Sequence, residues 1–144
     1  MADPKPLRLL AQDAEGLGVL SAALQDAVAK IGDIRWDAQS RTLTIACNRF
    51  RWDGAGKKGE RVRSALQFGD VSGVQARNLR RDAKGAVVSL MSIGFEPAEE
   101  APAGLVVLTF SGGGDMRVSV DCLDVALADV SDPWTTPRTP GHAD

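Results

Sequence analysis

Six basic residues crowd into a short stretch of the chain, with glycines between the middle ones. Residues 48–63 hold six Arg or Lys among sixteen, and residues 54–59 spell Gly-x-Gly-x-x-Gly around two lysines. Such a loop binds phosphate when a strand precedes it and a helix follows, because the phosphate sits on the amides that open the helix. The following segment, 60–68, alternates with period two and predicts a strand instead. We therefore interpret 54–59 as a hairpin loop and not as a nucleotide site.

The apolar positions change parity just before this loop. Odd positions are apolar first and even positions afterwards: Leu43, Ile45 and Cys47, then Phe50 and Trp52. One extra residue in a strand turns all following side chains to the opposite face. We therefore predict a β-bulge at Asn48–Arg49.

With this bulge, the arginines of the stretch share an outer face. Arg49 and Arg51 then point to solvent, and pairing Asp53 with Arg61 sets Arg51 opposite Arg63. Like charges held together favour a bound anion, so basic side chains here form a candidate anion-binding set. Its members are Arg49, Arg51, Lys57, Lys58, Arg61, Arg63, Arg77, Arg80 and Arg81. The rings point away from these cations, which disfavours stacking of single-stranded bases. A solvated basic hairpin is the simpler alternative.

Residue types used in catalysis are scarce. The only histidine is His142, near the C-terminus, so no Ser–His or Cys–His arrangement can form within the predicted domain. Cys47 and Cys122 occupy apolar faces, where a thiol packs more often than it reacts. One His and two Cys make a poor zinc set. We expect no catalytic residue, no metal site and no cofactor, and we rank an enzyme third among the functional classes.

The bulk composition is that of an ordinary globular domain. The chain has 144 residues, 44% hydrophobic and 25% charged, with four Phe, three Trp and no Tyr. This length fits one domain with an aliphatic core. Residues 49–84 carry ten basic and four acidic residues on a chain of net charge −2, which suits an anion-facing surface on an acidic body. The opening residues lack a secretory signal pattern, and the longest apolar run, 86–95, is too short for a membrane span. We expect a cytoplasmic protein without a membrane partner.

Local patterns predict one helix followed by strands. Residues 6–13 predict a short strand, and Asp13 is a suitable N-cap for a helix starting at Ala14. The helix carries an apolar stripe of Leu17, Leu20, Leu24, Ala27 and Val28. Two strands are expected around a turn at Asp37–Arg41, and further strands at 61–68, 71–79, 86–95, 105–110 and 116–122. A second parity change after Cys122 predicts either a bulge or a strand end.

Several blocks of the sequence resemble a family. They are LQDAVAKIGDIRW, NRFRW, RVRSALQF, FSGGGDMRVSVDCLDVALADV and the Pro-Trp tail, which together span nearly all of residues 7–142. In these blocks the chain is similar to a bacterial group, the domain-of-unknown-function family 2948. The resemblance implies no activity, cofactor or catalytic residue, so no role is carried over to any position.

These observations predict an α+β protein with one helix packed on a mostly antiparallel β-sheet or half-barrel. We expect an N-terminal tail at 1–6, one domain at 7–130 and an irregular Pro-rich tail at 131–144. In that tail, Trp134 either docks on the domain or a neighbouring subunit, or frays. The predicted function is a non-catalytic binding or accessory domain that acts through a protein partner or a second copy of itself. The alternative is anion or nucleic-acid binding through the hairpin at 49–63.

Overall fold

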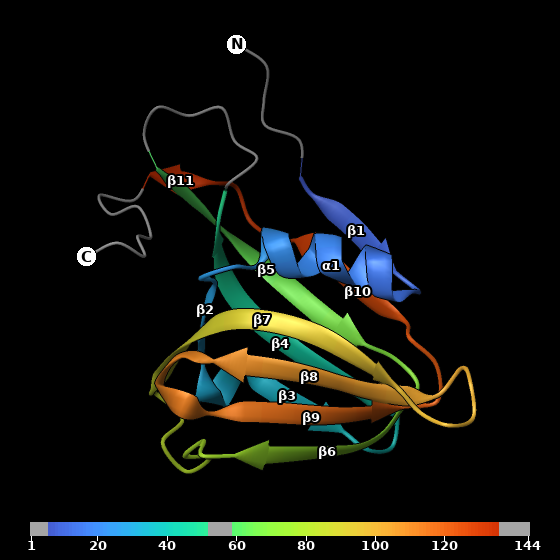
Figure 1. The fold of residues 1–144 in the computed structure, drawn as a ribbon. Coiled ribbons are helices and arrows are strands. Elements are labelled where there is room, and N and C mark those ends of the chain that lie inside the picture. Colours follow the sequence, from blue (N-terminus) through green and yellow to red (C-terminus); the bar gives the residue numbers. More distant parts are fainter. Residues whose placement is uncertain (1–5, 52–58, 136–144) are drawn as a thin grey trace.

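The computed structural model describes residues 6–51 and 59–135. Within them it places one α-helix, two 3₁₀ turns and eleven strands (Figure 1). Their bounds are β1 Arg8–Ala11, α1 Ala14–Ala23, β2 Val28–Lys30, η1 Ile31–Asp33, β3 Ile34–Asp37, β4 Thr42–Phe50, β5 Glu60–Phe68, β6 Val71–Arg77, β7 Val87–Pro97, β8 Gly104–Phe110, η2 Ser111–Gly113, β9 Asp115–Val120, β10 Val125–Asp129 and β11 Trp134–Thr135.

The helix begins where the sequence predicts and ends earlier. The Asp13 carboxylate accepts a hydrogen bond of 2.7 Å from the backbone N–H of Gly16, which caps the first turn of α1. The predicted stripe is buried in its first part, at Leu17, Leu20 and Leu24. Ala27 and Val28 lie beyond the helix, and Val28 starts β2, a strand that the sequence analysis did not predict. The apolar spacing therefore continued past the end of the helix by coincidence.

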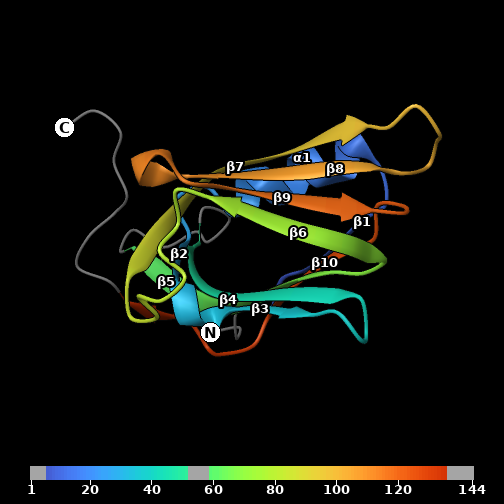
Figure 2. The same ribbon diagram turned by 90° about the horizontal axis from the view of Figure 1, so that it is seen from below.

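The strands form one open, folded antiparallel sheet. Its order is β1-β10-β5-β4-β2-β7-β8-β9-β6, with β3 also paired to β4 and β11 to β5. Figure 2 shows β7, β8, β9 and β6 in one layer, facing a second layer that contains β4 and β3. Helix α1 contacts β1 and β7 and so covers one side of the space between the layers. The prediction of one helix on an antiparallel sheet is confirmed, and the sheet does not close into a barrel.

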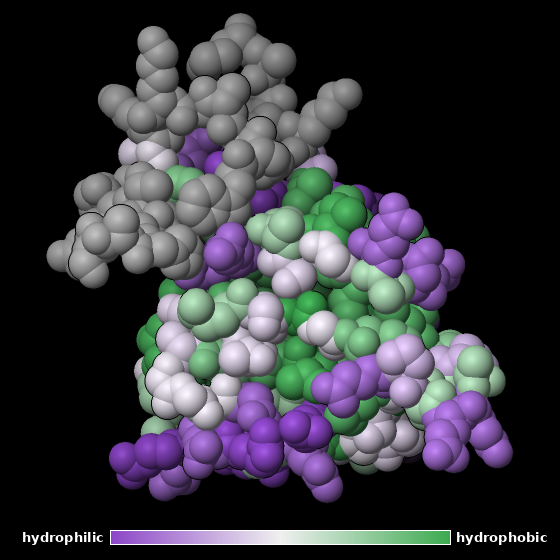
Figure 3. All heavy atoms as spheres, viewed as in Figure 1, coloured by the Kyte–Doolittle hydropathy of each residue, from purple (hydrophilic) through white to green (hydrophobic). Residues whose placement is uncertain are grey.

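The core between the layers is aliphatic, as expected. Leu43 and Ile45 of β4, Leu66 of β5 and Leu108 of β8 are all less than 5% exposed. Seen from outside, the face with α1 and β7 shows hydrophobic side chains around the helix and hydrophilic ones along the margin over β6 (Figure 3). No helix in the described part of the chain is long and apolar enough to cross a bilayer.

The bulge predicted at Asn48–Arg49 is absent. Strands β4 and β5 keep one register from Leu43↔Phe68 to Phe50↔Arg61, without a shift. Arg49 therefore points into the protein, on the same face as Cys47. Bulges occur instead between Val71 and Gly73 in β6 and between Leu90 and Ser92 in β7. The second parity change is a strand end, because β9 stops at Val120 and β10 starts at Val125.

Part of the predicted irregular tail is ordered against the sheet. Trp134 and Thr135 form β11 and pair with Arg61 and Glu60 of β5. The Trp134 side chain is partly exposed. The two residues extend the contact of the chain end with the domain, and residues 136–144 lie outside the described residues.

Candidate binding groove between two strand edges

Arg49 belongs to a buried ion pair and not to a basic surface. Its side chain is 1% exposed, and Nε and Nη2 donate to the two carboxylate oxygens of Asp129 at 2.9 Å each. The expectation that Arg49 faces solvent is wrong. The reason is that Asp129 of β10 lies opposite Arg49, and its carboxylate compensates the guanidinium charge in the low-dielectric interior.

Asp129 accepts hydrogen bonds from two further segments of the chain. Ser64 Oγ donates to it at 2.7 Å, and the backbone N–H of Leu7 donates at 2.8 Å. Burial alone would raise the pKa of Asp129, but the hydrogen bonds from Arg49, Leu7 and Ser64 outweigh burial and lower it. The carboxylate thus stays charged and ties β1, β4, β5 and β10 together. This cluster is a buried ion pair with further hydrogen bonds that stabilises the fold. Among the contacts described, its polar side chains are engaged with one another.

The other arginines of the hairpin are held by neighbouring groups. Arg51 Nη1 lies 2.9 Å from Glu60 Oε1, and Arg63 Nη2 lies 3.0 Å from Asp33 Oδ2. Arg61 stacks over the Phe50 ring at 5.9 Å, and burial lowers its pKa while nearby Asp26 opposes this. Arg51 and Arg63 are therefore balanced by carboxylates within the protein, whereas Arg61, in the described part of the chain, has only the nearby charge of Asp26.

The predicted pairing of Arg51 with Arg63 is wrong. The backbone N–H of Arg51 donates to the carbonyl of Glu60, and Arg63 pairs with Asn48. This register differs by three residues from the predicted one, which is more than the single residue by which a bulge shifts a register. Lys57, Lys58 and the Gly-x-Gly-x-x-Gly loop up to residue 58 lie outside the described residues.

The later arginines do not join the hairpin set. Arg77 forms a two-fold contact with Asp115 at 2.8 and 3.1 Å, and Arg80 is exposed. Arg81 instead lines a groove on another part of the molecule. Of the seven cations of the predicted set that the structure describes, Arg81 is the one that lines this groove.

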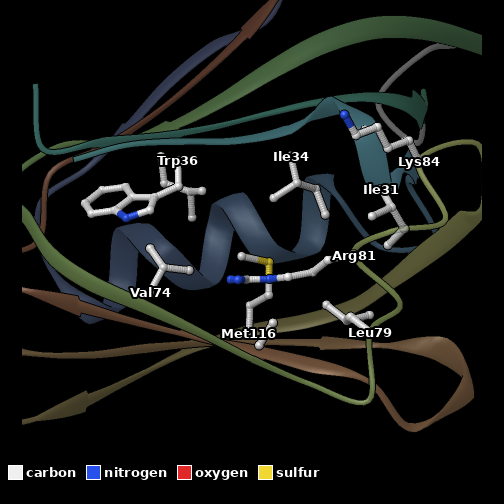
Figure 4. Close-up of a pocket in the computed structure, with 11 residues that line it drawn as sticks. Ile31, Ile34, Trp36, Val74, Leu79, Arg81, Lys84 and Met116 are labelled. Carbon is white, nitrogen blue, oxygen red and sulfur yellow. The ribbon is translucent and has the colours of Figure 1, made fainter. Parts of the chain in front are cut away.

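This groove lies between the edges of β3 and β6 and has a volume of about 310 Å³. We call it the β3–β6 groove. Its walls are mostly apolar and come from η1, β3, β4, β6, the segment after β6 and β9: Ile31, Gly32, Ile34, Trp36, Leu43, Val74, Ala76, Leu79 and Met116, together with Arg81 and Lys84. Figure 4 shows Trp36 and Val74 at one end and Ile31, Leu79 and Lys84 at the other. Arg81 extends from the Leu79 end toward the middle.

Hydrogen bonds fix both ends of the groove. At one end the N–H of Val71 donates to the carbonyl of Arg41 at 3.0 Å, and the Arg41 guanidinium pairs with Asp121. At the other end the N–H of Gly32 donates to the carbonyl of Lys84 at 2.9 Å. Strand β3 thus runs from the Lys84 end to the Arg41 end, and β6 runs in the opposite direction (Figure 2).

Each flanking strand has an unpaired edge. Among the described residues, β3 pairs only with β4, and β6 pairs only with β9. A strand edge of this kind presents a row of backbone donors and acceptors. The groove therefore combines an apolar floor with backbone hydrogen-bonding groups along its rim.

Two cations at the groove are without a carboxylate. Within the described residues, neither Arg81 nor Lys84 forms an ion pair, whereas Arg41, Arg49, Arg51, Arg63 and Arg77 all do. Trp36 is 37% exposed at the rim. An apolar cavity with Lys84 at one end and Arg81 reaching from that end toward the middle suits a ligand that is apolar along its length and acidic near that end.

Metal binding finds no support in the described ranges. Residues 6–51 and 59–135 contain no cluster of three or more His, Cys, Asp or Glu side chains placed to hold an ion. Cys122 donates weakly to Asp70 Oδ2 at 3.2 Å. Cys47 is buried, and this burial raises the pKa of its thiol to about 11.

Sequence analysis missed the groove, although part of its signal was present. The alternation of Ile34 with Trp36 and of Val74 with Ala76 gives each strand an apolar face. Nothing in the sequence indicates that these two faces meet at an uncovered side of the sheet.

The fold is that of a small α+β protein with an open antiparallel sheet, and the comparisons identify its family. The family described as "Protein of unknown function (DUF2948)" matches residues 7–142, and the chain belongs to it. Neither the curated proteins nor the solved structures contain a match to this chain.

Proposed function

We propose that this protein is a non-catalytic binding domain that docks an apolar segment of a partner protein in the β3–β6 groove. The observation that carries the proposal is the groove itself, a cavity of about 310 Å³ with mostly apolar walls that lies between two unpaired strand edges. Open strand edges beside apolar pockets are a recurring means of recognising peptide segments. We place the protein in the cytoplasm, a location that its two free cysteines fit.

A protein segment suits the groove better than a small molecule does. Strand edges recognise extended peptides through main-chain hydrogen bonds, with side-chain pockets supplying specificity. A volume of about 310 Å³ lies at the low end for small-molecule sites but accommodates the side chains of a short segment. The unpaired Arg81 and Lys84 favour an acidic residue at one end of that segment.

Nucleic-acid binding through the hairpin at 49–63 is the weaker proposal. Arg49, Arg51 and Arg63 already face carboxylates, so a phosphate would have to compete with Asp129, Glu60 and Asp33. A titration with labelled RNA and DNA at low and moderate salt tests it, because phosphate contacts weaken steeply with salt.

The groove proposal is tested with synthetic peptides. The set consists of fluorescein-labelled heptapeptides with two acidic residues first, followed by an apolar residue (Val, Ile, Leu or Phe) alternating with Thr. Fluorescence anisotropy measures their Kd with the wild type and with two groove variants, Val74→Glu and Arg81→Glu. We expect at least one peptide to bind and each variant to weaken it about tenfold or more.

Matched substitutions outside the groove are the controls. Val19→Glu changes an exposed valine of α1, and Arg8→Glu changes an exposed arginine of β1. Both should leave the Kd unchanged, and circular dichroism checks that all variants are folded. If no peptide of the set binds, or if groove and control variants bind equally well, the proposal is refuted. Size exclusion at high protein concentration tests whether a second copy of the chain is the occupant. A change in elution volume that is abolished by Val74→Glu would identify the second copy and would refute a foreign partner.

A further inference from the structure

We propose that the partner segment adds to the free edge of β6 as an antiparallel strand, with its acidic N-terminal end beside Arg81 and Lys84. This inference rests on the proposed function and specifies how the groove is filled. It concerns the backbone of the segment, whereas the proposed function concerns only the place where it docks.

Strand β6 provides the longer of the two edges. It covers seven residues against four for β3, and its bulge between Val71 and Gly73 leaves a regular edge from Gly73 to Arg77. Because a strand alternates its side chains, Val74 and Ala76 face the groove while Gln75 and Arg77 are exposed on the other face. A strand added at this edge would place every second side chain into the groove beside Val74 and Ala76.

The direction of the added strand follows from two observations. Every described pairing in the sheet is antiparallel, and antiparallel pairing is slightly more stable per residue than parallel pairing. A strand antiparallel to β6 starts next to Arg77, where β6 ends. The chain then continues into the segment that carries Arg81 and Lys84, so the first residues of the added strand meet these two cations.

The opposite end of the groove is already neutral. Arg41 pairs there with Asp121 and also donates from Nε to the carbonyl of Val71 at 3.2 Å. An acidic residue at that end would meet Arg41, whose side chain is already bound to Asp121 and to the carbonyl of Val71. Charge complementarity therefore favours acid at the N-terminal end of the segment and apolar residues after it.

The test compares backbone variants of the binding peptide. One series carries N-methyl groups on its apolar residues and the other on its Thr residues, which leaves the side chains unchanged. Alternate amides of a strand point to opposite edges, so one of the two series removes the hydrogen bonds to β6. We expect at least one series to lose affinity about tenfold or more, because two or three main-chain hydrogen bonds are lost.

Hydrogen exchange and a reversed peptide complete the experiment. Peptide binding should slow amide exchange between Gly73 and Arg77, and a peptide with the acidic pair moved to its C-terminal end should bind about tenfold more weakly. If the parent peptide binds while neither methylated series loses affinity, or while exchange in β6 is unchanged, strand addition is refuted and groove docking stands. A reversed peptide that binds equally well refutes the orientation. If no peptide binds at all, the proposed function itself has failed.

Discussion

Removing Arg49 should destabilise the protein far more than removing an exposed arginine. The Arg49 side chain is 1% exposed and the Asp129 side chain 4%, and two hydrogen bonds of 2.9 Å join them. In Arg49→Met, Asp129 keeps its bonds from Ser64 and Leu7 but loses its counter-charge. Leaving one member of a buried pair unpaired costs about 3–5 kcal/mol. For a chain of this size, that is a fall in Tm of roughly 10–15 °C.

A double-mutant cycle separates the ion pair from the packing of its members. Asp129→Asn alone should cost about as much as Arg49→Met, because it leaves Arg49 without its charged partner. The double variant removes both charges, and the amide oxygen can still accept from Ser64 or Leu7. We therefore expect its cost to fall short of the sum of the two single variants by about 2 kcal/mol or more.

Equilibrium unfolding in urea, followed by circular dichroism, measures these free energies. The matched control is Arg77→Met, which breaks the ion pair with Asp115 at a site where the arginine side chain is 58% exposed. Exposed pairs contribute about 1 kcal/mol or less. The assignment of Arg49–Asp129 as a stabilising buried ion pair is wrong if Arg49→Met unfolds at the same urea concentration as the control. It is also wrong if the free energies lost in the two single variants simply add in the double variant.

Three further predictions follow from local contacts. Folding lowers the pKa of Asp129, so the contribution of this carboxylate to stability is present above about pH 4 and is lost as pH falls through the folded pKa. Acid unfolding, followed by circular dichroism, should show this loss in the wild type and not in Asp129→Asn. The Cys47 thiol, with its pKa raised to about 11 by burial, should not react with Ellman's reagent at pH 8 until urea unfolds the chain, and rapid native labelling at Cys47 would contradict its placement. Gly104→Ala places a methyl group 2.3 Å from Phe95 Cζ and should cost about 1–3 kcal/mol in urea unfolding, whereas Gly18→Ala has open space on α1 and should stabilise by roughly 0.5–1 kcal/mol.

Most strands of this protein were predictable because their apolar side chains alternate, although β2 was not predicted. The turn between β3 and β4 and the N-cap at Asp13 are local features, and each is confirmed. The C-terminal end of α1 was not predictable from spacing alone. Ala27 stays buried although it lies after the helix, because the chain turns there and its N–H bonds back to the carbonyl of Leu24 at 2.9 Å. Apolar residues can keep helical spacing where the backbone is no longer helical.

The error at Arg49 has a more general cause. A period-two pattern assigns charged residues to the solvent face, so an inward arginine looks like a change of parity and predicts a bulge. The carboxylate that makes the inward position tolerable lies 80 residues away in β10, and a local pattern holds no trace of this pairing. The same error placed Arg49 on an apparent basic face. One buried charge thus accounts for the predicted bulge and for the inclusion of Arg49 in the predicted anion site.

The β3–β6 groove could not be predicted for a different reason. Its walls combine Ile34, Val74 and Met116, residues that are apolar in the sequence as any core residue is. What distinguishes them is that α1 covers one side of the folded sheet and no described element covers the other (Figure 2). A sequence encodes which faces are apolar, whereas the absence of a covering element is a property of the whole topology. The groove and its unpaired Arg81 therefore become visible only after the sheet is folded, and the peptide experiments address this exposed side directly.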